Sequence, residues 1–371
     1  MQTEHIELAN GLPGNRQSLH ILRFGQPGAR PKIYIQSALH ADELPGILVA
    51  HQLAEKLAEL ERCGQVAGEI VLVPLANPVG LAQNIMGVQH GRFDLRDGGN
   101  FNRGFAELAY RVAERLPVVL TQDSQENTHL VRSALIEAIG HLKTNSPGQD
   151  LKKQLLALAV DADIVLDLHC DTDAVMHVYG LTPQASMVQA LGAALGARAV
   201  LLATESGDSP FDEACTRPWL QLQTLLPEFP IKLACFGATI ELRGEADTDH
   251  NLARQDAAAL INFLAHQGAL TCKATPLPEP LCAATPLSGS EPITAPCSGV
   301  VVFRQKPGDR VVEGTVIADM VDAVTGAVTP VLCKSAGLVY ARGTARWANA
   351  GKRLAKIAGT SLARTGKLLS P

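Results

Sequence analysis

The residues of this chain best suited to chemistry are His40 and Glu43, which stand at His-x-x-Glu spacing. They follow the apolar run Ile33–Ile35 and precede an amphipathic stretch. Another histidine, His169, ends a second apolar run, Ile164–Leu168. Two imidazoles and one carboxylate at strand ends are the ligand set of an open, catalytic zinc site. The fourth position is then free for a water that the metal acidifies. The pattern therefore predicts a zinc hydrolase in which these three residues bind the metal.

Each of these residues also has an ordinary structural explanation. His40 could be a surface histidine beside a helix that starts near Pro45, and His169 could be a buried core histidine. Context favours ligation, because Asp167 lies next to His169 and a ligating imidazole usually donates its other N–H to a carboxylate. A further metal held by Asp171 or Asp173 is the less favoured alternative for the acidic residues around it.

Two neighbours of the predicted ligands are better explained by structure than by chemistry. Asp42 is expected to cap the following helix, although support of a ligand is an alternative. Cys170 follows His169 directly, so on a strand its side chain faces the opposite way. We therefore expect Cys170 to be a small buried thiol.

A glycine-rich segment from His90 to Arg103 carries three polar residues of interest, Arg92, Asn102 and Arg103. Arginines in irregular loops are usually solvated. Beside a metal they can instead hold a substrate carboxylate through two hydrogen bonds, or face the carbonyl oxygen that becomes negative in the transition state.

A carboxylate, Glu241, ends the apolar run Ala238–Leu242. It could simply be solvated at a strand end. A metal-water mechanism, however, needs a general base that takes the proton of the water and delivers it to the leaving amine. Glu241 is the best placed candidate, and Glu245, Glu205 and Glu213 are weaker ones.

The elements that must position these residues alternate between short apolar runs and longer helical stretches, which indicates an α/β fold with a mostly parallel, twisted sheet. In such sheets, ligand sites gather at the carboxyl ends of the strands, where His40, His169 and Glu241 lie. The predicted strands are 33–35, 70–74, 164–168, 199–203 and 238–242, and the predicted helices are 44–60, 124–144, 151–160, 185–195 and 251–265.

The composition changes after residue 270. Residues 271–290 are rich in proline and predict a linker between a hydrolase domain, 1–270, and a C-terminal β domain, 291–371. The β domain contains a weak internal repeat that pairs Gly299 with Gly337, which indicates a pseudo-symmetric β-sandwich.

The predicted β domain resembles the biotinyl/lipoyl-type barrel-sandwich. Carrier domains of that type present a lysine in the hairpin between their two halves. The corresponding turn here, Asp322–Ala327, has no lysine, so a structural or lid function is expected.

Composition excludes several classes of partner. The 371 residues are 46% hydrophobic and carry a net charge of −5 without a Lys/Arg cluster, which argues against nucleic acid and anionic membranes as partners. No apolar run reaches the ~20 residues that a membrane span needs. The N-terminus does not resemble a signal peptide, and the eight cysteines form no Cys-x-x-Cys. We therefore expect reduced thiols and a cytoplasmic protein.

Taken together, the motifs resemble the succinylglutamate desuccinylase/aspartoacylase family, which belongs with the zinc carboxypeptidases. The resemblance covers roughly residues 30 to 270, and the C-terminal β module is similar to the one that these deacylases carry. It depends on the order of the following motifs: His40-x-x-Glu43, Asn77-Pro78, Arg92, Asn102-Arg103, Asp167-Leu-His169 and Thr239-Ile-Glu241.

The resemblance implies a zinc-carboxypeptidase-like domain that hydrolyses the amide bond of an N-acyl amino acid. His40, Glu43 and His169 would bind Zn²⁺ and Glu241 would be the general base. Arg92 would polarise the scissile carbonyl, and Asn102 with Arg103 would hold a carboxylate of the substrate.

Two departures from the family pattern bear on specificity. The family sequence Asp-Leu-Asn-Arg appears here as Asn100-Phe-Asn-Arg103. The second substrate-binding arginine of aspartoacylases has no clear match, although Lys232 or Arg217 could substitute for it.

Three functions remain in competition after these observations. The first is a deacylase that acts on a small N-acyl amino acid. The second is a metallocarboxypeptidase that uses the same residues on peptide C-termini, and the third is a binding protein without catalysis. The intact set of ligands and Glu241 argues against the third. The sequence leaves the oligomeric state open, homo-oligomers included.

Overall fold

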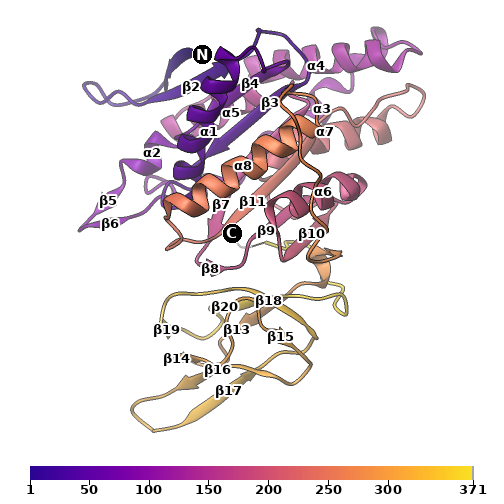
Figure 1. Cartoon of the computed structure of the whole chain (residues 1–371). Helices are drawn as coiled ribbons and strands as arrows, with labels where there is room; N and C mark the ends of the chain where they lie inside the picture. Colours follow the sequence, from indigo (N-terminus) through magenta and orange to yellow (C-terminus); the bar gives the residue numbers. More distant parts are fainter. Residues whose placement is uncertain (370–371) are drawn as a thin grey trace.

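A nine-stranded mixed sheet forms the centre of the α/β part of the molecule (Figure 1). The computed structural model describes residues 1–369. The strands follow the order β1 (Gln2–Glu7), β2 (Ser18–Phe24), β4 (Glu69–Val73), β3 (Lys32–Ser37), β7 (Ile164–Asp171), β11 (Phe236–Gly244), β9 (His177–Leu181), β10 (Ala199–Ala203) and β12 (Ala284–Pro286). Five of the eight pairings are parallel. The other three are antiparallel.

The expectation of an α/β fold is therefore confirmed, and the parallel character is strongest in the centre of the sheet. β3 and β4 are buried at every position, and β7 at every position but its last. Such continuous apolar runs are typical of strands that are covered on both faces. The antiparallel strands β1, β2 and β9 were not predicted, because they are short or lie at the amphipathic edge of the sheet.

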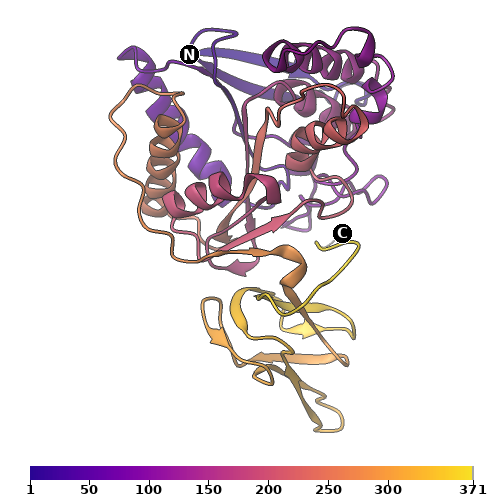
Figure 2. The same cartoon turned by 90° about the vertical axis from the view of Figure 1, so that its right-hand side faces the viewer.

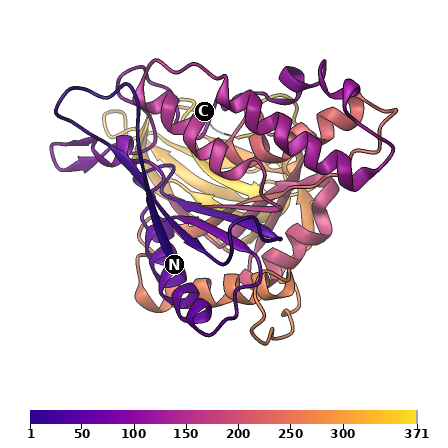
Figure 3. The same cartoon turned by 90° about the horizontal axis from the view of Figure 1, so that it is seen from above.

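Helices cover both faces of this sheet, as the view from above shows (Figure 3). One face packs against α1 (Pro45–Arg62), α6 (Ala185–Leu195) and α8 (His250–His266). The other packs against α3 (Ala109–Val112), α4 (Ser124–Gly140), α5 (Pro147–Ala159) and α7 (Phe211–Leu225). Of the long helices, α7 is the one that the sequence pattern did not predict, since Pro218 interrupts its interior.

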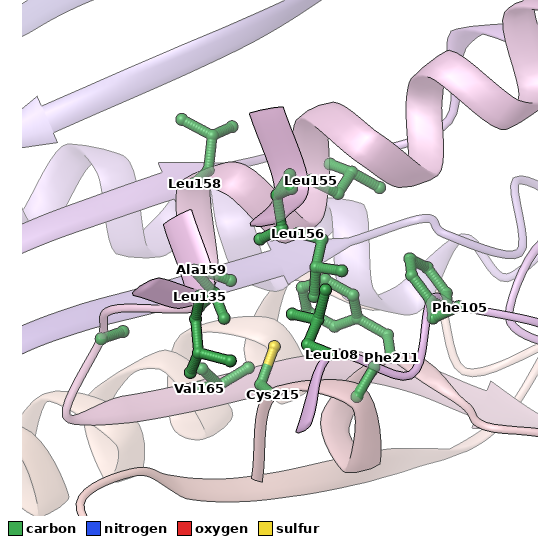
Figure 4. Close-up of a cluster of buried hydrophobic side chains, with 14 of the residues drawn as sticks. Phe105, Leu108, Leu135, Leu155, Leu156, Leu158, Ala159, Val165, Phe211 and Cys215 are labelled. Atoms are coloured by element: carbon green, nitrogen blue, oxygen red, sulfur yellow. The ribbon is translucent and has the colours of Figure 1, made fainter. Parts of the chain in front are cut away.

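The core under α7 contains the largest buried side chains near the site (Figure 4). Phe211, at the start of α7, is fully buried and its ring lies 5.6 Å from that of Tyr34 and 5.3 Å from that of Phe105. Leu108, Leu155 and other aliphatic residues surround them. This packing fixes the N-terminus of α7 against β3, and therefore next to the predicted site.

The C-terminal part is all-β and contains two antiparallel sheets (Figure 1). One holds β13 (Glu291–Thr294), β20 (Arg353–Ala358), β18 (Gly337–Arg342) and β15 (Arg310–Val311). The other holds β17 (Val328–Leu332), β16 (Val316–Val321), β14 (Gly299–Phe303) and β19 (Trp347–Ala348). The turn 322–327 joins β16 to β17, as the repeat predicts. The stretch expected to be a linker is partly ordered, because β12 pairs with β10 and a short 3-10 helix, η3 (Leu287–Gly289), follows it.

The β part is attached to the α/β part by strand pairing and by a shared apolar cluster. The short strand β8 (Asp173–Ala174) pairs with β18, and the Val175 N–H donates to the Tyr340 carbonyl. A cluster of buried residues from both parts, including Leu201 and Leu338, lies between them. The segment after β20 returns to the α/β part, where the Leu368 N–H donates to the Ser206 carbonyl, and Figure 2 shows this path.

Two further observations concern the molecule as a whole. Among residues 1–369, no helix is long and apolar enough to cross a membrane. The eight cysteines are free thiols, and Cys170 is buried, as expected.

Candidate metal centre and active site

The three predicted ligands are positioned by β3, α1 and β7. His40 and Glu43 lie in the short connection between β3 and α1, and His169 lies on β7, which runs parallel to β3. Gly46, in the first turn of α1, allows the close approach, because a Cβ there would lie 3.1 Å from the Leu168 carbonyl oxygen. The start of α1 is thereby held against the end of β7, which brings the three side chains together.

The carboxylate of Glu43 lies between the two imidazoles. Its Oε1 is 2.8 Å from His40 Nδ1, and its Oε2 is 2.6 Å from His169 Nδ1. The three residues are 2 to 5% exposed, and one ligand atom from each lies within 4.8 Å of the others. In the part of the chain that the structure describes, this is the one group of histidine, cysteine and acidic side chains that could hold a metal ion.

The outer nitrogens of both imidazoles face acceptors. His40 Nε2 lies 2.9 Å from Asn100 Oδ1, and His169 Nε2 lies 3.0 Å from Asp167 Oδ2. His40 Nε2 can therefore donate, which leaves its Nδ1 lone pair for the centre, whereas His169 Nε2 lies between Asp167 Oδ2 and the amide of Asn102. Carbonyl or carboxylate partners of this kind fix the tautomer of ligating histidines. The donor set and its support thus fit a divalent metal.

The electrostatics of the group also suit a cation. Burial lowers the pKa of His40 and favours the neutral, ligating imidazole. Burial opposes ionisation of Glu43, but His40 and His169 outweigh it and hold the pKa of Glu43 well below its usual range. The guanidinium of Arg92 adds a second compensating charge, with Nη1 3.0 Å from Glu43 Oε1. These positive partners compensate the buried charge of Glu43 in the metal-free site, and a bound metal cation would take over that compensation.

Glu241 lies in the row of side chains next to His169. In the sheet register, Glu241 on β11 is opposite His169 on β7 and opposite His177 on β9. Burial, followed by the charges of Glu43 and Asp171, raises the pKa of Glu241 to about 8. Its Oε2 has no hydrogen-bond partner among the described residues. A buried carboxyl with a raised pKa and an unused oxygen is typical of a group that exchanges protons.

The glycine-rich loop brings Arg92, Asn102 and Arg103 to the same pocket. Asn102 is buried. Its Oδ1 accepts from the Phe211 N–H at 2.9 Å, and its Nδ2 lies 3.2 Å from His169 Nε2. Arg103 donates to the Asn102 carbonyl at 2.7 Å, and burial followed by Arg92 lowers its pKa. Asn102 therefore aligns the loop with α7, while the two arginines carry the positive charge.

The residues that the sequence offered as alternative bases or as a second substrate-binding cation lie in different parts of the structure. Glu245 and Glu213 line the pocket, whereas Glu205 is 59% exposed and pairs with Arg217. Neither Arg217 nor Lys232 lines the pocket, so neither replaces the missing arginine.

The acidic residues around His169 have partners of their own. Asp171 pairs with Lys356 and Asp173 with Arg342, so these two carboxylates hold the β part.

The expectation that Asp42 caps the helix is wrong. Leu44 occupies the cap position of α1 without a side-chain hydrogen bond, because the chain enters the helix through a tight turn.

Three residues of the pocket were not foreseen from the sequence. Lys356 reaches it from β20, Asp212 from the first turn of α7, and Tyr179 from β9. Lys356 is distant in sequence and lies in the β module, so no local pattern indicates it. Asp212 could have been noticed as an acidic residue at a helix start, but α7 itself was missed.

The comparisons with known proteins agree with this geometry. Residues 29–135 match the model of the succinylglutamate desuccinylase/aspartoacylase catalytic domain. A family protein from Shewanella amazonensis has a TM-score of 0.83 and 26% identity, with 96% of this chain and 98% of that chain covered. Another, from Shewanella frigidimarina, has a TM-score of 0.82 and 23% identity, with 97% of each covered. A product-bound ectoine utilization protein from Ruegeria pomeroyi has a TM-score of 0.64 and 17% identity, with 97% and 95% covered. No curated protein matches the chain in sequence.

Fold and site together define a hydrolase-type α/β domain with a histidine and glutamate group that could bind a metal. Residues 29–135 match the catalytic-domain model of the succinylglutamate desuccinylase/aspartoacylase family, the family that the motifs resemble. Members of that family are deacylases, and the shared architecture extends over almost the whole chain.

Replacing His169 by alanine is expected to remove most of the bound metal, because a three-ligand site cannot easily lose one ligand. Metal content after reconstitution and dialysis measures this. The matched control is His177→Phe, which alters a buried histidine of β9, two strands from β7 in the sheet, and should keep its metal. Full occupancy in the His169 variant would contradict the ligand set.

The acid sensitivity of the protein is expected to depend on His177. Burial lowers the pKa of this histidine to about 4, whereas in the unfolded chain it is near 6.5. Between these values the unfolded chain binds more protons, so stability falls as the pH falls. Relative to wild type, His177→Phe should gain up to about 1.4 kcal/mol in unfolding free energy per pH unit across that window.

Chemical denaturation of the metal-free protein at pH 7, 6 and 5 measures this difference. The control is His51→Phe, whose histidine side chain is 57% exposed. Its pH dependence should stay parallel to that of wild type. Parallel curves for the His177 variant as well would show that His177 titrates normally.

Proposed function

We propose that this protein is a zinc-dependent amidohydrolase that cleaves the amide bond of N-acyl amino acids. The observation that carries the proposal is the buried group His40, Glu43 and His169, with Glu241 beside it in one pocket. The match to a deacylase catalytic domain supports the same reaction class.

The two imidazoles and the carboxylate would hold the zinc. When bound, zinc supplies Lewis acidity, which polarises the scissile carbonyl and acidifies a water. The ring orientations of His40 and His169 are kept by Asn100 and Asp167, so that their Nδ1 atoms remain directed at the centre.

Glu241 is the proposed general base. It takes the proton of the attacking water on one carboxylate oxygen and delivers it to the nitrogen of the leaving amine. Two features of the structure support this role: the raised pKa of about 8 and the free Oε2. Its position opposite His169 in the sheet register also supports this role.

The arginines of the loop are proposed to hold and polarise the substrate. Arg92, which lies next to Glu43, donates to the carbonyl oxygen as negative charge develops there. Arg103 holds the carboxylate of the amino acid. Asn102 contributes to this carboxylate site chiefly by aligning Arg103, since its amide already contacts Phe211 and His169.

The β module is proposed to form a wall of the pocket. Lys356 and Leu287 line it from beyond residue 270. A pocket closed on that side favours a small substrate over a peptide, which supports the deacylase over the metallocarboxypeptidase. We propose that the chain is divided into a hydrolase domain (1–270), a linker (271–290) and a C-terminal β domain (291–371). The β domain is proposed to be a biotinyl/lipoyl-like sandwich without carrier function.

A hydrolysis screen of the zinc-loaded protein tests the proposal. It covers N-acetyl, N-succinyl and N-formyl amino acids together with short peptides, and detects the released amine. The expected result is cleavage of N-acyl amino acids without release of C-terminal amino acids from the peptides. Release of C-terminal residues from peptides alone would favour the carboxypeptidase.

Glu241→Gln separates the base from the ligands. Glutamine keeps the shape of the side chain but cannot accept the proton, so kcat should fall by ~10² to 10⁴ while zinc content stays unchanged. The matched control is Glu245→Gln, which alters a more exposed carboxylate of the same pocket and should keep most of the turnover. A large loss in the control with normal turnover in the Glu241 variant would move the base to Glu245.

A further inference from the structure

The end of the pocket formed by the start of α7 is acidic. Asp212 and Glu213 occupy the first turn of α7, are 7 and 8% exposed, and line the pocket. Thr239, which lies on β11 two residues before Glu241, lines the same pocket as Asp212 and Glu213. These two carboxyls therefore adjoin the reaction centre from the side of the sheet that carries Glu241.

One of these carboxylates has an oxygen without a hydrogen-bond partner. Glu213 Oε1 accepts from the Ser206 N–H at 2.7 Å, but Oε2 has no hydrogen bond among the described residues. The nearest cation, Arg217, is 3.8 Å from Oε2 and lies closer to Glu205, at 3.2 Å. A buried carboxylate oxygen left in this state is costly unless a donor reaches it.

The electrostatic environment of the pair is consistent with a missing cation. Burial and then Asp167 raise the pKa of Asp212 to about 6, and burial and then Asp212 raise the pKa of Glu213 to about 7. Asp212 thus opposes the charge of Glu213, and Arg217 compensates for this only in part, since the pKa of Glu213 remains raised. A positively charged ligand would complete the compensation.

The charges of the whole pocket point the same way. Among the described residues, carboxylates outnumber cationic side chains in its lining: Glu43, Asp171, Asp212, Glu213, Glu241 and Glu245 against Arg92, Arg103 and Lys356. A substrate with two carboxylates would increase this imbalance.

The walls that lead to the acidic end are apolar. Leu181, Leu201, Ala203 and Leu287 line the same pocket as Asp212 and Glu213. A hydrocarbon stem can pack on such walls while its charged end reaches a carboxylate, as lysine and arginine side chains do on protein surfaces. The combination of apolar walls and an acidic end matches a long basic side chain.

We propose that Asp212 and Glu213 form a specificity subsite for a positively charged side chain, so that the amino-acid half of the substrate is basic. The proposal rests on the proposed deacylase function and names its substrate class. Arg103 receives the α-carboxylate, the apolar walls receive the alkyl stem, and the two carboxylates receive the ammonium or guanidinium group. The lack of the second substrate-binding arginine of aspartoacylases follows from this preference.

The test compares Nα-acyl-L-lysine, Nα-acyl-L-norleucine and Nα-acyl-L-glutamate, each with the acyl group that is cleaved best in the screen. Norleucine keeps the alkyl stem of lysine and lacks the ammonium group. The expected kcat/KM for the lysine compound exceeds that for norleucine by roughly 10- to 100-fold, the range for a hydrogen bond to a charged group. The glutamate compound should be the poorest of the three.

Two variants assign this preference to the subsite. Asp212→Asn and Glu213→Gln should each reduce the ratio of kcat/KM for the lysine compound to kcat/KM for the norleucine compound about tenfold. A purely structural defect would lower kcat/KM for both compounds and keep the ratio. The matched control is Glu228→Gln, which removes an exposed carboxylate that does not line the pocket. Its ratio should equal that of wild type.

Calorimetric binding of free L-lysine and L-norleucine to the zinc-loaded protein separates this proposal from the deacylase function. If the acyl amino acids are cleaved and norleucine or glutamate is preferred, the subsite is refuted and the deacylase stands. If no amide is cleaved but lysine binds in preference to norleucine, the subsite stands and the deacylase falls. Equal binding without cleavage refutes both.

Discussion

The buried charge of Glu43 is the constraint on which the rest of the site depends. Its two oxygens contact His40, His169 and Arg92, and the Cys170 N–H donates to Oε2 at 3.1 Å. A buried carboxylate is tolerated only when such partners surround it. Because these partners come from the β3–α1 connection, from β7 and from the glycine-rich loop, the same charge that suits a metal also fixes three segments relative to one another.

The register of the sheet also fixes the residues of the candidate metal centre relative to those that would contact the substrate. β7 and β11 are paired so that Asp167 is opposite Thr239, and His169 opposite Glu241. Residues two apart on a strand share a face, so the two successive rows lie on the same face of the sheet. One row carries the candidate ligand and base. In the next row, Asp167 lies next to His169, and Thr239 lines the same pocket as Asp212. Reaction chemistry and specificity are thereby set by adjacent positions of the same two strands.

The sequence predicts most of this arrangement where the signal is local. His40 and Glu43 stand three residues apart between a strand and a helix, and His169 and Glu241 end apolar runs, so their convergence follows from the parallel sheet alone. Asp212 and Lys356 could not be placed in this way. The helix that carries Asp212 contains a proline in its interior, and Lys356 meets Asp171 across 185 residues of chain. Such contacts depend on how the β module packs against the α/β part, and the hydrophobic periodicity of the sequence does not indicate this.

The pairing of Lys356 with Asp171 has a consequence for the order in which the protein matures. The catalytic sheet is complete in sequence once β12 has been synthesised, and domains generally fold as they emerge during translation. Its pocket would still lack the cation that neutralises Asp171 until β20, near the end of the chain, has left the ribosome. An early-folded sheet would therefore carry an open and more negative pocket. The pocket would therefore reach its final charge balance only when synthesis of the chain is almost finished.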